Sequence, residues 1–339
     1  MRLVALALIV ACSGKHAAAI DAAVATSDIA LPLAWLSSTV TTQTASIIIE
    51  TVSYLSSDGT LVLNGQVCYP ADGAPHPVFV FAHGGFSGLT TELQPGSLCA
   101  AIAGQGFAVL EPSYRDEDGS QGAVEVCLGE VDDLLRMVQI GLAQPFADPT
   151  RVGIEGGSHG GCITLRALER GVPVVVASDQ FGITDMTADY AYWQSQPSDA
   201  EAQMLIAQLD QSVGGPPSAF PAAYQARSPI AFVQDLPALP LMIAHGTADL
   251  YVDYTQSCTF ASAVGGFQAY DLDATGQTVQ AEIPAGCDLP GLTWNTQPLP
   301  TTWADTNYLL LYNDVGHDVT SPGGMAMSLN VVEFVLTKI

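Results

Sequence analysis

The sequence has 339 residues, of which 48% are hydrophobic and 13% charged, so it can bury a large core and is not expected to be disordered. Its 34 acidic residues against 9 Lys and Arg give a formal net charge of −25 at pH 7. A charge of this size and sign repels phosphate backbones and anionic lipid headgroups, so nucleic acid is not an expected partner.

The first residues have the pattern of an export signal. Arg2 precedes an apolar run from Leu3 to Ala11, which is too short to cross a bilayer. The run ends directly before Cys12, a pattern that resembles the bacterial lipobox, in which the cysteine becomes the lipidated N-terminus. We expect a signal peptide over residues 1–11 and an exported protein, in the periplasm or at the cell surface, that lipid alone holds at the membrane. An ordinary signal peptide with an incidental cysteine is the alternative.

Residues 12–45 are rich in Ala, Ser and Thr and lack helical or strand periodicity. This composition is typical of a flexible tether. The folded domain is therefore expected to cover residues 46–339.

Six further cysteines follow, and an even number in an exported protein suggests disulfides. None has CxxC spacing, so we expect no zinc site, and nothing indicates a cofactor. The favoured pair is Cys258 with Cys287, which would close a long loop, and Cys99 with Cys127 comes second. Cys162 is interpreted as a buried free thiol.

Short apolar runs alternate with amphipathic stretches along the rest of the chain. The expected strands are 46–55, 60–69, 77–82, 107–111, 151–155, 172–178, 239–244 and 308–312. The expected helices are 93–105, 124–142, 162–170 and 325–336. This alternation predicts an α/β fold with one mostly parallel sheet flanked by helices.

Two segments interrupt this alternation. The first, about residues 185–227, combines helical segments with aromatic residues and is expected to form a cap over the site. The second, about residues 265–305, is rich in Gly, Pro and Thr and is expected to be a loop insertion. Both follow strands, where sheets of this kind place their binding loops.

The most informative motif is a G-x-S-x-G sequence, from Gly156 to Gly160, between a predicted strand and a predicted helix. A sharp turn from strand to helix leaves no room for side chains at its flanks, so glycine is required there. The turn projects the serine hydroxyl outward, and the following helix N-terminus favours negative charge. Ser158 is therefore the predicted nucleophile.

A serine nucleophile needs a base and an acid that orients the base. His317 is the candidate base, because it alone among the histidines follows the last predicted strand. Asp249 ends the strand before that one, which is where an α/β-hydrolase places its acid. Asp253 and Asp314 are the competing acids.

The developing oxyanion needs two backbone donors. The first is expected to be the N–H of His159, which follows the nucleophile. The second is expected from the HGGF loop after an earlier strand, where we favour the N–H of Gly85. His83 and His245 are interpreted as structural residues.

Several of these segments together resemble the catalytic domain of the prolyl oligopeptidase family and its dienelactone-hydrolase-like relatives. The resemblance lies in FAHGG, SYRDEDGS, DPTRVGIEGGSHGG, the HGTAD segment and GHD, and it runs from about Val52 to the C-terminus. It implies an α/β-hydrolase fold and a Ser-Asp-His triad. It places Ser158, Asp249 and His317 on the triad positions, and His159 and Gly85 on the oxyanion positions.

The chain departs from those peptidases in three respects. Only about 50 residues precede the hydrolase domain, which is too few for a β-propeller. His83 stands where some members of the family have a tyrosine that helps to hold the oxyanion. The insertion at 265–305 is the third departure.

These departures favour a serine hydrolase that cleaves carboxylic esters or small amides through an acyl-enzyme, with small molecules as substrates. The alternative is a serine-type peptidase of the named family. A third hypothesis is a non-catalytic binding lipoprotein on a hydrolase scaffold, although neither its serine nor its histidine is missing. The sequence predicts no oligomeric state.

Overall fold

The computed structural model describes residues 31–89, 95–279 and 283–339. The predictions for the signal peptide (1–11), for acylation at Cys12 and for the tether up to residue 30 lie outside the described residues. Residues 33–339 form one compact unit. Within the described ranges, no helix combines the length and the apolar character needed to cross a bilayer.

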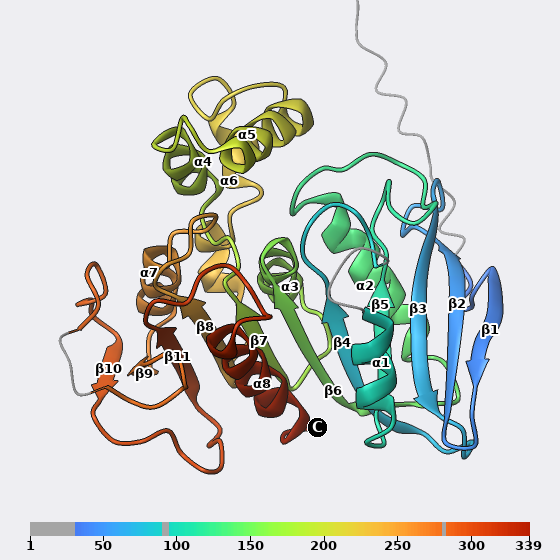
Figure 1. Cartoon of the computed structure of the whole chain (residues 1–339). Helices are drawn as coiled ribbons and strands as arrows, with labels where there is room; N and C mark the ends of the chain where they lie inside the picture. The colour runs from blue at the N-terminus through green and yellow to red at the C-terminus, as the bar shows by residue number, and fades with distance from the viewer. Residues whose placement is uncertain (1–30, 90–94, 280–282) are drawn as a thin grey trace, which may run out of the picture. The chain divides into compact units, whose positions relative to one another are not determined.

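The described residues build an 11-stranded sheet in the order β1-β2-β3-β5-β4-β6-β7-β8-β11-β9-β10 (Figure 1). The strands are β1 (Ser37–Gln43), β2 (Ile47–Leu55), β3 (Val62–Pro70), β4 (His76–Ala82), β5 (Ala108–Pro112), β6 (Ala147–Gly157), β7 (Val176–Gln180), β8 (Leu241–Gly246), β9 (Phe267–Leu272), β10 (Leu292–Asn295) and β11 (Asn307–Tyr312). The pairs from β1 to β5 are antiparallel, and all pairs from β5 to β10 are parallel. The prediction of a mostly parallel sheet is confirmed.

Helices cover both faces of this sheet, as Figure 1 shows. They are α1 (Pro95–Ala103), α2 (Gly129–Gly141), α3 (His159–Glu169), α4 (Met186–Gln194), α5 (Ala200–Val213), α6 (Pro221–Gln225), the 3₁₀ helix η1 (Pro229–Asp235), α7 (Thr255–Val264) and α8 (Pro322–Leu336). Helices α1 and α8 pack on one face, while α2, α3 and α7 pack on the other. Because both faces are covered, the inner strands β5, β7 and β8 are buried throughout.

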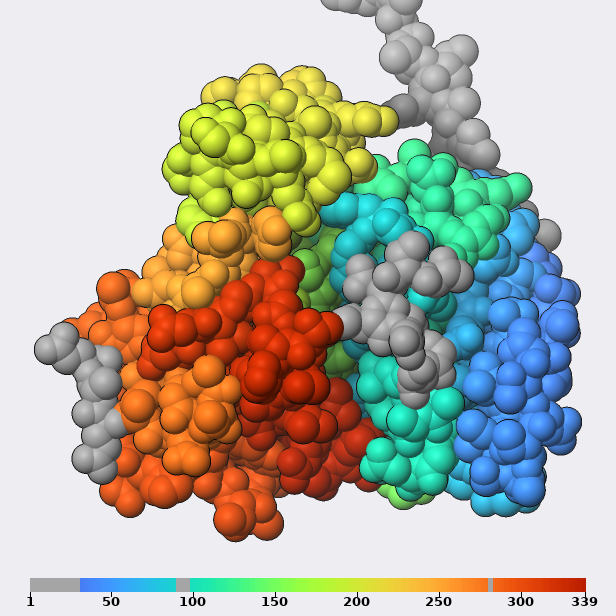
Figure 2. Space-filling view, in the orientation of Figure 1, coloured from blue at the N-terminus to red at the C-terminus, as the bar shows by residue number. Residues whose placement is uncertain are grey.

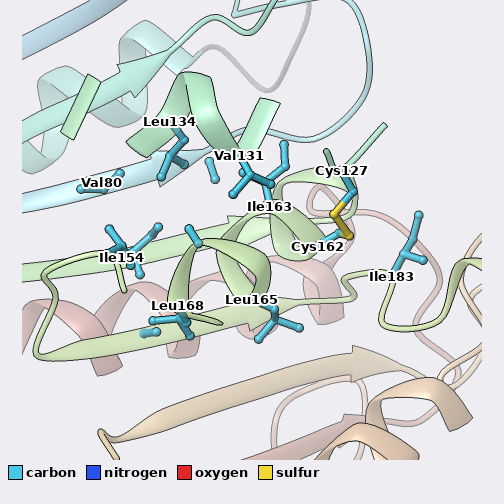
Figure 3. Close-up of a cluster of buried hydrophobic side chains, with 14 of the residues drawn as sticks. Val80, Cys127, Val131, Leu134, Ile154, Cys162, Ile163, Leu165, Leu168 and Ile183 are labelled. Carbon is cyan, nitrogen blue, oxygen red and sulfur yellow. A yellow bond between two sulfur atoms is a disulfide. The ribbon is translucent and has the colours of Figure 1, made fainter. Parts of the chain in front are cut away.

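The hydrophobic core lies in two layers, one on each face of the sheet. Figure 3 shows part of the first layer, where Val80 of β4 and Ile154 of β6 lie opposite side chains of α2 and α3. Leu134 of α2 and Ile163 of α3 are fully buried there. This packing fixes the start of α3, and therefore the motif that precedes it, against the sheet.

The structure differs from the expected tether, because residues 37–43 form β1, which pairs antiparallel with β2. All seven residues of β1 are exposed, and most are Ser or Thr. A polar edge strand has no apolar face, so it lacks the periodic signal by which a strand is predicted.

The expected loop insertion at 265–305 contains a strand of the central sheet. Strand β9 (Phe267–Leu272) pairs in parallel with β11, and five of its six residues are buried. The apolar run of β9 is short and interrupted by Gln268, and glycine-rich sequence surrounds it. For these reasons this strand was not predicted from the sequence. Strand β10 and helix α7 were likewise not predicted.

The cap, residues 185–227, is built from α4, α5 and α6, which lie above the carboxyl ends of the central strands in Figure 1. The Asp185 side chain accepts hydrogen bonds from the first turn of α4, and Asp199 does the same for α5. Gly214 ends α5 in a left-handed conformation. Ordinary capping residues therefore define the cap helices.

Three disulfides join the described cysteines. The favoured pair, Cys258 with Cys287, is confirmed. The second pair was wrong, because Cys99 bonds Cys68 and Cys127 bonds Cys162, so Cys162 is not a free thiol. Helices α2 and α3 pack together, which brings the Cα of Cys127, two residues before α2, to 6.0 Å from the Cα of Cys162 in the first turn of α3. Because this proximity results from tertiary packing, the pairing of Cys127 with Cys162 could not be predicted from the sequence.

The Cys258–Cys287 bond closes a loop with a sequence separation of 29 residues. Replacing both cysteines by alanine should lower the free energy of unfolding by about 3 kcal/mol, because the unfolded chain regains the entropy of that loop. Chemical denaturation of both proteins measures the difference. Non-reducing peptide mapping is the control, and recovery of a Cys99–Cys127 peptide would contradict the structure.

Candidate active site

Ser158 occupies a sharp turn between β6 and α3. Its φ of 57° and ψ of −123° lie in a region that non-glycine residues rarely adopt. The Ser158 N–H donates to the carbonyl of Gln180 on β7 at 2.9 Å, and the Ser158 carbonyl accepts from Cys162 in α3. These two bonds hold the strained residue between the sheet and the helix.

Glycines surround this turn because backbone occupies the space that side chains would need. A Cβ on Gly156 would lie 2.3 Å from the carbonyl oxygen of Gly160, and one on Gly160 would lie 1.9 Å from that of Ala82 in β4. A Cβ on Gly84 would lie 3.2 Å from Ser158 Cβ. The motif glycines therefore allow β4, β6 and α3 to converge at the serine.

The structure brings the three residues of the predicted triad together. His317 Nε2 lies 2.9 Å from Ser158 Oγ, and His317 Nδ1 lies 2.6 Å from Asp249 Oδ2. Because the carboxylate accepts the Nδ1–H, Nε2 is left to accept the serine proton. The loops that carry Asp249 and His317 touch directly, since the Ala248 N–H donates to the carbonyl of Val315.

Asp249 is buried, yet it remains ionised. Burial alone would raise the pKa of this carboxyl, but hydrogen bonds from His245 and His317 lower the pKa well below its usual range. The backbone N–H groups of Tyr251 and Val252 also donate to Asp249 Oδ1, at 2.8 and 2.9 Å. Asp249 is thus a fixed negative charge behind His317.

The competing acids lie elsewhere. Asp253 Oδ1 accepts from the N–H and the hydroxyl of Thr255, at the start of α7. Asp314 has a left-handed φ of 58°, and its N–H donates to the hydroxyl of Thr247. Among the described contacts, His317 meets neither of them, whereas its Nδ1 hydrogen-bonds Asp249.

His159 and Gly85, the expected oxyanion donors, both line the cavity beside Ser158. The imidazole of His159 has a further function that the sequence did not indicate. Its Nδ1–H donates to the carbonyl of Gly85 at 3.0 Å, and its Nε2 accepts from the N–H of Cys127 at 2.9 Å. Burial lowers the pKa of His159, which keeps the ring neutral and able to accept.

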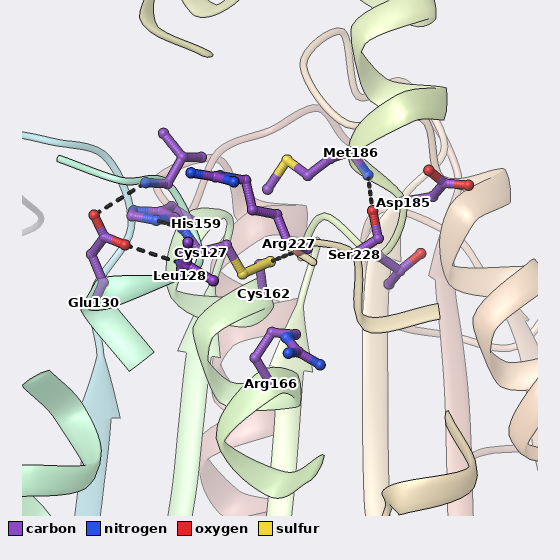
Figure 4. The surroundings of a disulfide bond; sticks show 12 residues. Cys127, Leu128, Glu130, His159, Cys162, Arg166, Asp185, Met186, Arg227 and Ser228 are labelled. Carbon is purple, nitrogen blue, oxygen red and sulfur yellow. Dashed lines mark hydrogen bonds between the residues drawn. A yellow bond between two sulfur atoms is a disulfide. The ribbon is translucent and has the colours of Figure 1, made fainter. Parts of the chain in front are cut away.

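Figure 4 shows His159 beside the Cys127–Cys162 bond, which joins the loop before α2 to α3. Together with the His159 hydrogen bonds, this bond ties three segments to the nucleophile turn: the Gly85 loop, the Cys127 loop and α3. These partners are 74 and 32 residues away from His159, so no local pattern could have identified them.

His83 and His245, which were interpreted from the sequence as structural, are both buried beside the site. His83 is fully buried, stacks on Tyr114 and has Nε2 3.1 Å from Glu117 Oε2. His245 is also fully buried; its Nε2 lies 3.2 Å from Asp249 Oδ2, and its Nδ1 lies 2.7 Å from Ser257 Oγ. The contact of His245 with Asp249 was not foreseen.

A cavity of about 800 Å³ opens at Ser158 and His317. Figure 2 shows this face hollowed between the yellow-green cap, the red C-terminal segment and the cyan segment that follows β4. The cap side of the cavity is formed by Val126, Ile183, Trp193, Glu201, Met204, Leu205, Gln208, Leu209, Tyr251 and Val252. This wall is mostly apolar, and the volume can hold several amino-acid residues or a molecule of similar size.

Two aromatic rings pack against His317. The Phe181 ring is 4.2 Å from the imidazole, and the Tyr251 ring is 5.4 Å away at an interplanar angle of 89°. The sequence did not single out either residue. They limit the rotation of His317 and leave its Nε2 directed at Ser158.

A mostly parallel sheet with flanking helices, a serine at a strand–helix turn and a facing imidazole–carboxylate pair define a serine hydrolase of the α/β-hydrolase fold. Residues 100–280 match the model of the prolyl oligopeptidase family, which covers peptidases of the S9 class. The chain therefore belongs to the prolyl oligopeptidase family, and its resemblance to that family is confirmed.

Two curated relatives match the chain. The uncharacterized peptidase YtmA of Bacillus subtilis (strain 168) is 28% identical over 208 residues, which is 61% of this chain and 76% of that protein. The human acylamino-acid-releasing enzyme is 32% identical over 156 residues, which is 40% of this chain and 21% of the enzyme.

Solved structures share the fold. A puromycin-hydrolyzing peptidase of Mycobacterium tuberculosis superposes with a TM-score of 0.62 at 22% identity, over 88% of this chain and 40% of its own. The acylaminoacyl peptidase of Pyrococcus horikoshii superposes with a TM-score of 0.60 at 19% identity, over 86% and 42%. The chain thus spans about two fifths of each of these solved proteins.

Exchanging Asp249 for asparagine tests whether Asp249 is the carboxylate that orients His317. Asp249→Asn should lower kcat for p-nitrophenyl acetate by about 10³-fold or more, because the amide can donate to Nδ1 and favour the wrong imidazole tautomer. Asp253→Asn is the matched control, since asparagine still accepts from Thr255 and should change kcat by only a few-fold. A larger loss for Asp253→Asn would assign the acid to Asp253.

Proposed function

We propose that this protein is a serine-type peptidase that cleaves short peptides through an acyl-enzyme, with Ser158 as nucleophile, His317 as base and Asp249 as the orienting acid. The observation that carries the proposal is the continuous Ser158–His317–Asp249 hydrogen-bonded chain, with 2.9 and 2.6 Å links, at the base of an 800 Å³ cavity. Membership of a peptidase family supports the choice of substrate.

In the proposed reaction, Ser158 Oγ attacks the scissile carbonyl while His317 Nε2 takes its proton. The N–H groups of His159 and Gly85 hold the oxyanion, and Asp249 stabilises the imidazolium. His317 then donates the proton to the leaving amine. Water, activated by the same imidazole, hydrolyses the acyl-enzyme and regenerates the serine hydroxyl.

Peptides replace esters as the main expected substrates. The sequence favoured esters because no β-propeller was expected, but three of the four relatives described above are named as peptidases. The fourth is named as an acylamino-acid-releasing enzyme, and none of the four is named as an esterase. A triad that cleaves amides also cleaves activated esters, because an ester has the better leaving group. Ester hydrolysis alone therefore does not separate the two functions, whereas hydrolysis of an unactivated peptide does.

Ser158→Ala should abolish both cleavage of short peptides and hydrolysis of p-nitrophenyl acetate, a loss on the order of 10³-fold or more in kcat, while the protein stays folded. Mass spectrometry of a tri- to hexapeptide mixture reports the first activity, and absorbance reports the second. A fluorophosphonate probe should label the wild type and spare the variant. If the protein hydrolyses the ester but cleaves no peptide, the peptidase proposal is wrong and an esterase function is favoured.

We further propose that the protein is exported and anchored through lipid on Cys12. The lipobox-like sequence supports acylation, and the three disulfides among the described cysteines support an oxidising compartment. One acyl chain holds a protein only marginally, so a stable anchor needs several chains.

Cys12→Ser should therefore move the protein from the membrane fraction to the soluble fraction, because the thiol that carries the lipid is gone. Immunoblots of fractionated cells measure the distribution. Ser13→Ala is the neighbouring control and should stay with the membrane. Retention of Cys12→Ser in membranes would rule out the lipid anchor.

A further inference from the structure

The candidate cavity extends beyond the cap to the opposite face of the sheet, where α8 packs. This part is lined by Phe81 of β4, Leu98 of α1, Glu155 of β6, Gln180 of β7 and Ser328 and Val332 of α8. We call it the α8 subsite. Neither the triad nor the expected oxyanion donors belong to it.

Glu155 faces α8 from the sheet. A Cβ on Gly153, two residues earlier on β6, would lie 2.4 Å from Val335 of α8, so alternate residues of β6 point to that helix. Glu155 pairs with Phe81 on β4 and with Ser178 on β7, and the Ser178 hydroxyl donates to the Val331 carbonyl of α8. The Glu155 side chain therefore enters the α8 subsite between neighbours that share its face.

Glu155 is only 3% exposed, and its Oε2 has no hydrogen-bond partner. Burying an unpaired polar atom costs free energy, so such an atom inside a cavity points to a partner outside the chain. Gln180 and Ser328 hydrogen-bond each other in both directions, at 2.9 and 3.1 Å, and are thereby occupied. Burial and the nearby Asp179 raise the pKa of Glu155 to about 8.

The charges around the cavity favour a cationic partner. Among the described residues that line it, three are carboxylic acids, Glu155, Glu201 and Asp318, and none is Lys or Arg. Asp318 accepts from backbone N–H groups of its own turn, and Glu201 accepts from the Tyr251 hydroxyl. Of the three, only Glu155 has a buried carboxylate oxygen without a hydrogen-bond partner.

We propose that the α8 subsite binds a positively charged side chain of the substrate, such as that of lysine or arginine, on Glu155. This inference rests on the proposed peptidase function. Three residues along a strand span about 10 Å, so the Glu155 carboxyl lies within the reach of a long side chain on a residue next to the scissile bond. An ammonium or guanidinium group there supplies donors to Oε2 and stabilises the ionised carboxylate.

The test uses pairs of short peptides that differ only by lysine against norleucine, in one series before the scissile bond and in another after it. In one of the series, kcat/KM for the lysine peptide should exceed that for its norleucine partner by at least about tenfold. Glu155→Gln should bring this ratio close to one. A ratio near one in the wild type, or an unchanged ratio in the variant, would overturn the proposal.

Two control variants make the result specific. Glu111→Gln removes another buried glutamate whose pKa burial raises to about 8, but Glu111 lies on β5 outside the cavity and should leave the ratio as in the wild type. Glu201→Gln removes the carboxylate on the cap side. Loss of lysine preference in Glu201→Gln instead of Glu155→Gln would move the cation to the cap and refute the α8 subsite.

Binding separates this inference from the proposed function. Calorimetry on Ser158→Ala should detect n-butylamine but not n-butanol, and Ser158→Ala/Glu155→Gln should weaken the amine at least about tenfold. Thermal melting of Glu155→Gln checks its fold, and it should melt no lower than the wild type because a buried ionisable group is gone. Amine binding without any peptide cleavage would refute the proposed peptidase function alone. Peptide cleavage without amine binding would refute the proposed cation binding in the α8 subsite.

Discussion

The left-handed backbone of Ser158 constrains everything around it. Its φ of 57° is held by a bond to β7 and a bond to α3, and it requires bare backbone at Gly156 and Gly160. Because β4 then passes directly beside the turn, the Gly84–Gly85 loop lies against the serine. The geometry of the nucleophile thus dictates which strands are neighbours and where the loops that meet the substrate begin.

The sequence predicted those residues of the site that belong to short local motifs. A serine between glycines after a strand, and Asp249 at a strand end, are patterns within a few residues. The contacts of His159 with Gly85 and Cys127, and of His245 with Asp249, depend on tertiary packing and could not be read from spacing. Strand β1 was missed for another reason, because most of its residues are Ser or Thr and give no apolar pattern. Strand β9 depends on tertiary pairing, since its partner β11 comes about 40 residues later.

Substrate specificity was the property least predictable from the sequence, because the walls of the cavity come from segments far apart in the chain. The cap supplies Trp193 and Leu205, the loop before α2 supplies Val126, and α8 supplies Val332. Composition identified an acidic protein, but it could not tell which carboxylates face the substrate. Asp185 and Asp199 of the cap are helix caps, whereas Glu155, inside a run that indicated only a strand, lines the cavity.

Strand β11 lies between β8 and β9, both of which precede it in the chain. It therefore joins two strands that come earlier in the chain, through contacts that are distant in sequence. Such non-local pairing is slow in folding because loop entropy is lost before contacts are gained. His317 follows this strand directly, so the base reaches Ser158 only when the sheet is complete. A chain that ends before β11 therefore lacks His317, so its serine turn has no proton acceptor.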